Sequence, residues 1–170
     1  MRFAQSDYSY EEMNKIQKQL LKLAIEEFAA AGVFAFLYSQ LNIAFNTGVA
    51  VTMAFSYLVF ILLQGSGYWL YRYRLIRINR TSGRKAVGLL KLSKWLNLAI
   101  LIVLSVLIPV ISRRSALIIA MAVLLFGTIE YVNYYWYRLS YGKTGFNIST
   151  LLNTALKKSS INKLINSPSH

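Results

Sequence analysis

Two polar residues stand at matching depths inside otherwise apolar stretches of the chain. Glu130 lies eight residues before Arg138, and Gln64 lies eight residues before Arg72. If each stretch is a membrane-crossing helix that ends at its arginine, both side chains lie about 12 Å inside the membrane. An ionisable group at that depth is costly to insert, which makes Glu130 a candidate functional residue.

Five polar side chains together form the candidate site. Each of the four apolar stretches carries at least one of them near the same end, and they are Glu27, Gln64, Asn97, Glu130 and Asn133. One interpretation is a polar cavity that opens to the cytoplasm and holds a substrate, an ion or a titrating proton. The other, which we favour, is a set of hydrogen bonds between helices in which Glu130 bonds to Gln64 and Asn133.

The residue types that many enzymes and metal sites use are missing. The chain has no cysteine, and its only histidine is the last residue, His170. Thiol chemistry and disulfides are therefore excluded, and zinc, haem and iron–sulfur centres are not expected. The sequence contains no phosphate-binding loop and no nucleophile motif. We accordingly predict no catalytic residue, no cofactor and no metal site.

The candidate residues must be positioned by helices that cross a membrane. The chain has 170 residues, 56% of them hydrophobic and 15% charged, and the 44 residues from Phe28 to Tyr71 carry no charge. A span needs about 20 apolar residues, so this run holds two spans, with a polar turn at 42–48 between them. We predict an all-α fold: a four-transmembrane-helix bundle that forms one membrane domain over residues 1–170, with spans at about 23–41, 49–71, 95–112 and 115–137.

Basic residues are concentrated on one side of this predicted bundle. The segment between the second and third spans holds eight Lys and Arg and no acid, and the tail after the fourth span adds five, whereas the turn at 42–48 has none. The positive-inside rule therefore places both termini in the cytoplasm, with Arg113 and Arg114 as exceptions on the outer side. We expect an integral protein of a bacterial cytoplasmic membrane. Anionic lipid headgroups would balance its net charge of +13, and nucleic-acid binding is not expected.

Aromatic residues cluster where the second and fourth spans end. Tyr68 and Trp69 close the second span, and Tyr134, Tyr135 and Trp136 close the fourth. Amphipathic rings are typical of the membrane–water interface, where they hold a helix at a fixed depth. We therefore predict that these rings form an interfacial belt rather than a binding site.

Amphipathic stretches occur at both ends of the chain. Residues 1–22 are predicted to form a cytoplasmic helix that begins at Ser9, which makes a capping-box pattern with Glu12. This helix lies on the membrane or extends the first span, and docking to a partner is the alternative. In the basic tail, 138–170, apolar stripes at 148–156 and 161–165 predict binding to anionic bilayer surfaces. Within the first span, Ala31, Ala35 and Ser39 predict a face for helix packing.

Three classes of function follow from these features. A non-catalytic accessory or scaffold subunit, assembled with itself or with a partner membrane protein, agrees best with a chain that shows no catalytic pattern. A small oligomeric transporter or channel with a cytoplasm-facing polar cavity around Glu130 is the alternative. A lipid-modifying membrane enzyme ranks third, because Glu130 alone supports it.

Overall fold

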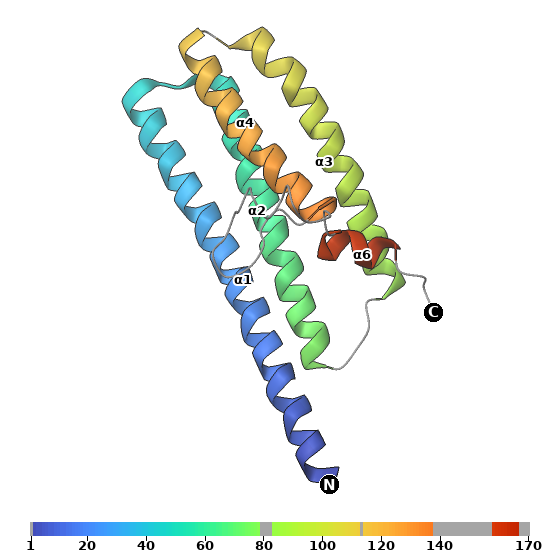
Figure 1. The fold of residues 1–170 in the computed structure, drawn as a ribbon. Coiled ribbons are helices and arrows are strands. Elements are labelled where there is room, and N and C mark those ends of the chain that lie inside the picture. The colour runs from blue at the N-terminus through green and yellow to red at the C-terminus, as the bar shows by residue number, and fades with distance from the viewer. Residues whose placement is uncertain (1, 79–82, 113, 138–157, 167–170) are drawn as a thin grey trace, which may run out of the picture.

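The computed structural model describes residues 2–78, 83–112, 114–137 and 158–166; for residues 2–11, 114 and 115 it describes the backbone alone. The regular structure within these residues is entirely helical (Figure 1). Four long helices follow one another as α1 (Arg2–Phe45), α2 (Gly48–Arg77), α3 (Arg84–Ile111) and α4 (Arg114–Tyr135). A short helix, α6 (Ser160–Asn166), comes last.

The four long helices form an up-and-down bundle with α2 at its centre. Helix α2 packs against α1, α4 and α3, while α6 packs across the ends of α3 and α4 (Figure 1). Two short turns, one between α1 and α2 and one between α3 and α4, lie at one end of the bundle, which we call the turn end. Helix α6 lies towards the other end, where α2 ends and α3 begins, and we call this the α6 end. The hydrophobic core runs along α2 and contains Val51, Leu58 and Ile61, none of them exposed.

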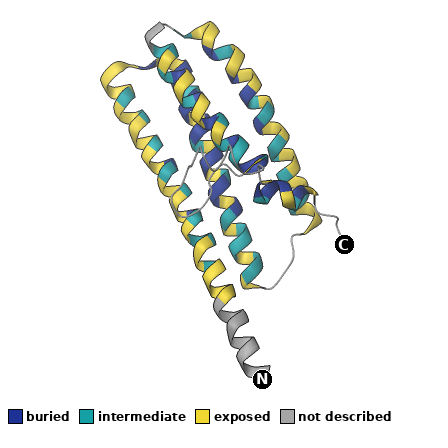
Figure 2. Cartoon of the chain, in the orientation of Figure 1, coloured by how far each residue is buried: buried dark blue, intermediate teal, exposed yellow. Residues whose placement is uncertain are grey.

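The outer surface of the bundle is apolar over most of its length. Helices α2, α3 and α4 are each long and apolar enough to cross a membrane. Large apolar side chains such as Phe36, Val103 and Ile118 face outwards, and exposed positions cover the outer sides of α1 and α3 (Figure 2). Such a surface is unlike that of a soluble monomer and is typical of contact with lipid. Helix α1 is the least apolar of the four, so the first of the four predicted spans stays a prediction.

The predicted turn between the first two spans is confirmed. Helix α1 ends at Phe45, and Asn46 takes a left-handed backbone conformation with φ +47°, followed two residues later by Gly48 with φ +78°. Asparagine and glycine adopt such values at little cost, which is why this sequence reverses direction here. The Thr47 hydroxyl donates to the side-chain oxygen of Asn42, 3.1 Å away, and closes the turn.

Helix α1 agrees with the prediction in one respect and differs from it in two. The amphipathic stretch continues into the first apolar stretch, which is one of the two predicted arrangements, but the helix begins at Arg2 rather than at Ser9. Its packed face also differs, because Ala31 is buried whereas Ala35 and Ser39 are exposed. Most of the less exposed positions instead alternate at spacings of three and four: Gln17, Leu20, Ala24, Glu27, Ala31, Phe34, Tyr38 and Leu41. Leu21, Leu23 and Ala30 are also less exposed and lie beside this series. Residues spaced strictly four apart move gradually around a helix, whereas residues spaced alternately three and four apart stay on the face that contacts the neighbouring helix.

Two glycines allow close contact between α2 and α4. A Cβ added to Gly65 of α2 would lie 2.5 Å from Cζ of Tyr134, and one added to Gly127 of α4 would lie 3.0 Å from the ring of Tyr57. Each helix thus places a tyrosine ring on a glycine of the other. Because both residue numbers rise together along the contact, the two helices run parallel.

The end of the chain folds back onto the bundle. The backbone N–H of Ser159 and the side-chain amide of Asn162 both donate to the carbonyl oxygen of Trp136, each at 3.1 Å. Ile161 and Ile165 of α6 join the hydrophobic core. The apolar stripe at 161–165, predicted to bind a bilayer surface, therefore packs inside the molecule, because it can cover the ends of α3 and α4. The stripe at 148–156 lies outside the described residues.

Candidate functional site

The first polar group joins α2, α3 and α4, and we call it the Gln64 cluster: Gln64, Ser93, Asn97 and Tyr135. The Gln64 side-chain oxygen accepts from Asn97 Nδ2 at 2.7 Å and lies 3.1 Å from the hydroxyls of both Ser93 and Tyr135. Those two hydroxyls are 2.7 Å apart. Asn97 is fully buried and also donates to the Ser93 carbonyl oxygen at 2.8 Å. The predicted partnership of Gln64 and Asn97 at one site is thus present as a direct hydrogen bond.

The Gln64 cluster attaches α3 to the rest of the bundle. Helix α3 buries only Asn97, Leu101, Leu104 and Ile108. Hydrogen bonds between membrane helices contribute about 0.6 kcal/mol on average, and a helix with a narrow packed face depends on them more than the others do. The cluster satisfies most of its own polar atoms, which is the arrangement expected of a structural element.

The second polar group joins α1 and α4. The Tyr134 hydroxyl is buried next to the carboxyl groups of both Glu27 and Glu130. Asn133 hydrogen-bonds to Glu130 from the next turn of α4. We call these four residues the Glu27 cluster: Glu27, Glu130, Asn133 and Tyr134.

The five predicted site residues therefore divide between two groups. Gln64 and Asn97 belong to the first, and Glu27, Glu130 and Asn133 belong to the second. Tyr134 and Tyr135 explain the division, because successive residues of a helix point about 100° apart. Tyr134 reaches across Gly65 towards α1, and Tyr135 reaches Gln64 on the side of α3. The expected hydrogen bond between Glu130 and Gln64 is not formed.

A cavity of about 320 Å³ opens beside the Glu27 cluster at the α6 end. Its polar lining includes Glu27, Asn133 and Tyr134, and its walls come from α1, α2, α4 and α6. Glu130, Gln64 and Asn97 do not line it. The cavity predicted around Glu130 is therefore centred on Glu27 instead.

The aromatic rings at the span ends differ from the predicted belt. Tyr68, Tyr134 and Tyr135 are 5% exposed or less, so they pack inside the bundle rather than facing the interface. Trp136 partly fits the belt, and the Lys94 ammonium lies 3.6 Å above its ring centroid. Sequence reasoning missed Ser93 and the tyrosines as partners of the polar residues. The glycines at 65 and 127 were the available signal, since glycine in a span permits close approach of a large side chain.

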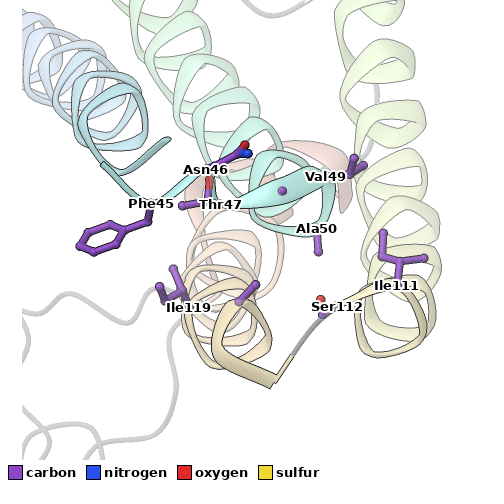
Figure 3. A pocket seen from close by; sticks show the side chains of 10 residues that line it. Phe45, Asn46, Thr47, Val49, Ala50, Ile111, Ser112 and Ile119 are labelled. Atoms are coloured by element: carbon purple, nitrogen blue, oxygen red, sulfur yellow. The ribbon is translucent and has the colours of Figure 1, made fainter. Parts of the chain in front are cut away.

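A second cavity, of about 550 Å³, lies at the turn end between the two short turns (Figure 3). Apart from Asn46, Thr47 and Ser112, its lining is apolar or glycine. Figure 3 shows Phe45 directed away from the other labelled side chains. None of the described side chains that line this cavity is charged, so the α6 end carries the stronger candidate site.

The described residues include no cluster of three or more histidine, cysteine, aspartate or glutamate side chains suited to a metal ion. The site consists of two carboxyl groups, one amide and a tyrosine, and this set can bind a cation or accept hydrogen bonds. Comparisons with protein-family models, with curated proteins and with solved structures give no match.

Proposed function

We propose that this chain is a non-catalytic accessory or scaffold subunit of a membrane, most simply the bacterial cytoplasmic membrane. One observation carries the proposal: the polar groups inside the bundle lie at the α6 end, and apolar packing separates them from the turn end. The Gln64 cluster bonds to itself across three helices. Such a bundle supports assembly rather than passage of a solute through one chain.

The apolar packing begins directly beyond the polar groups. Towards the turn end, the buried side chains of α2 include Phe55, Leu58 and Ile61, and α3 and α4 add Leu104 and Leu124. The Tyr57 hydroxyl is the polar exception among the large buried side chains there, and its ring covers Gly127. Among the described residues, this core offers no continuous polar path for an ion between the two ends of a single chain.

The proposal includes four spans and cytoplasmic termini. Helix α1 packs along α2, and its outward side chains include Phe28, Val33 and Phe36, so its second half agrees with a span. Both α1–α2 and α3–α4 are joined by short turns at one end, so α1 begins and α4 ends at the opposite end, which supports termini on one side of the membrane. The basic segment around Arg72–Lys94 lies at that same end, which favours the cytoplasm.

The partner surface that we propose is the outer side of α3. This helix is held along a narrow strip, and its exposed side chains form an apolar face that includes Leu92, Leu96, Val103 and Val106. A second copy of the chain or a partner membrane protein would cover this face. Lipid would cover it otherwise, and the experiment below separates the two cases.

Photo-crosslinking in intact membranes tests the accessory role. A photoreactive amino acid at Val103, which is 59% exposed, is compared with one at Leu104, which is 8% exposed and adjacent in the chain. We expect a protein adduct of discrete mass from position 103 and none from position 104. Co-expression of two differently tagged copies then shows whether the adduct is a homodimer. An absence of protein adducts at position 103, with crosslinking to lipid only, contradicts the proposal.

The second candidate function is an oligomeric transporter, favoured by the cavity that Glu27 lines at one end. Its test is the flux of K⁺, H⁺ and small amines through liposomes that contain the purified protein. An accessory subunit leaves the vesicles as tight as empty ones. A protein-dependent flux that Glu27→Gln abolishes would establish the transporter instead.

A further inference from the structure

The cavity at the α6 end has unusual walls for a site so close to lipid. Its aromatic side is formed by Tyr68, Trp69 and Tyr134, and its acidic group is Glu27. The rings of Tyr68 and Trp69 meet edge to face with centroids 5.0 Å apart. Ser160 of α6 adds a hydroxyl on the remaining side.

The polar atoms of these aromatic side chains are buried. They are the hydroxyls of Tyr68 and Tyr134 and the indole N–H of Trp69. Tyr68 and Tyr134 are 5% and 4% exposed, respectively. Because these polar atoms have almost no accessible surface, the aromatic wall presents ring carbons to a molecule in the cavity.

The charge of the cavity is negative within a strongly basic protein. No Lys or Arg of the described residues lines it. Glu26 pairs with Lys22 at 3.6 Å, whereas the adjacent Glu27 forms no ion pair among the described residues. Glu130 adds a second carboxyl group behind Tyr134. In a chain of net charge +13, this cavity offers a cation carboxyl groups with no Lys or Arg of the described residues beside them in the lining.

We propose that the cavity binds the ammonium group of a small organic cation. Glu27 is the counter-ion, and the rings of Tyr68 and Trp69 supply the aromatic wall that such groups favour. The shared chemistry is the ammonium group, and its source is either a free amino alcohol or the headgroup of a phospholipid.

The volume and position of the cavity agree with this ligand. About 320 Å³ accommodates a headgroup-sized molecule but not a large drug-like one. The cavity lies at the end of the bundle where the polar side chains collect, so a headgroup reaches it from the interface and a free amine reaches it from solution. This proposal does not depend on the accessory role, because an accessory subunit and a transporter could each carry such a binding site.

The test uses the full-length protein in nanodiscs made only of phosphatidylglycerol, which has no ammonium. Choline and ethanolamine are titrated while tryptophan emission is recorded, and Trp69→Phe identifies the signal of Trp69. We expect saturable binding to the native protein and to Glu26→Gln, the neighbouring control. Glu27→Gln should bind about tenfold more weakly or worse, because it removes the charge-assisted contact. The neutral carbon analogue of choline, 3,3-dimethylbutanol, should give no saturable response.

A second set of nanodiscs, which contain phosphatidylethanolamine, distinguishes the two sources. If the headgroup is the occupant, Trp69 emission is already shifted in these discs and added ethanolamine changes it no further. If a free amine is the occupant, the titration is the same in both kinds of disc. The proposal is overturned if neither the soluble amines nor the lipid changes the emission of the native protein, or if Glu27→Gln binds as tightly as the native protein.

Tyr68→Leu decides the matter if Glu27→Gln does not fold. This variant keeps the Trp69 signal but removes one ring of the aromatic wall. Its affinity should fall by about fivefold, the effect of one lost cation–π contact of ordinary strength. Unchanged affinity in a folded Tyr68→Leu protein contradicts the proposed site.

Discussion

The ring of Tyr134 lies directly on the backbone of Gly65, so close that a Cβ at position 65 would stand 2.5 Å from the ring carbon Cζ and 2.6 Å from the hydroxyl oxygen. This contact fixes the spacing of α2 and α4 at the level of both polar groups. It directs Tyr134 towards the carboxyl groups of Glu27 and Glu130. The adjacent Tyr135 is left to bond with Gln64. One glycine therefore separates the two polar groups of the bundle.

Gly65→Ala should destabilise the protein, because the added methyl group forces Tyr134 out of its place. Overpacking of this kind costs about 1–3 kcal/mol. Gly67→Ala is the matched control, since a Cβ there meets nothing within 4 Å. Thermal unfolding in detergent should show a lower midpoint for Gly65→Ala and an equal or higher one for Gly67→Ala.

The Gly65→Ala loss should be partly relieved by Tyr134→Leu in the same chain, because the smaller side chain leaves room for the methyl group. A double-mutant cycle measures this coupling. Strictly additive losses would show that the two residues do not meet as described.

Glu130→Leu and Gln64→Leu should lower stability independently, because their side chains belong to different groups. Each loss is expected to be about 0.5–2 kcal/mol, in the range measured for hydrogen bonds between membrane helices. The contrasting pair is Gln64→Leu with Asn97→Leu, because these two side chains are joined by a hydrogen bond of 2.7 Å. The decreases in unfolding midpoint should therefore be additive for the first pair and less than additive for the second. The reverse pattern would support the contact between Glu130 and Gln64 that the sequence predicted.

Single cysteines should show that the turn end faces outwards. The chain has no native cysteine, so Asn46→Cys, Thr81→Cys and Thr144→Cys each report one site. An impermeant maleimide applied to intact cells should label position 46 only, and positions 81 and 144 should react after the cells are opened. The reason is the concentration of Lys and Arg on the opposite side. Labelling of position 81 from outside means that the orientation is inverted.

Helix α6 should protect its apolar face from solvent. Ile165 is 8% exposed, whereas Lys163 of the same helix is exposed. In purified protein, a cysteine at position 163 should react with maleimide at least about tenfold faster than one at position 165, as expected when reaction requires local opening. Asn162→Ala removes the donor to the Trp136 carbonyl oxygen and should bring the two rates closer together. Equal rates in the otherwise native chain would mean that α6 is not docked.

The sequence by itself determined the helical class and the main boundaries of this protein. Hydropathy alone located α2, α3 and α4, because twenty apolar residues in a row have few alternatives to a membrane-crossing helix. The left-handed turn at Asn46 and Gly48 was equally legible, since few residue types adopt those backbone angles. The polar residues with functional promise could also be named, because polar side chains are rare in apolar stretches.

Only the tertiary structure decided which of these residues meet. The rotation of each helix about its axis is not encoded by its overall hydropathy, and a shift of one residue turns a side chain by about 100°. This is why Glu130 and Gln64, alike in depth, join different groups, and why Tyr68, Tyr134 and Tyr135 are buried instead of forming a belt. The docking of α6 likewise depends on the surface that α3 and α4 create together. Packing, through the heptad of α1 and the glycines at 65 and 127, set the rotations that composition left open.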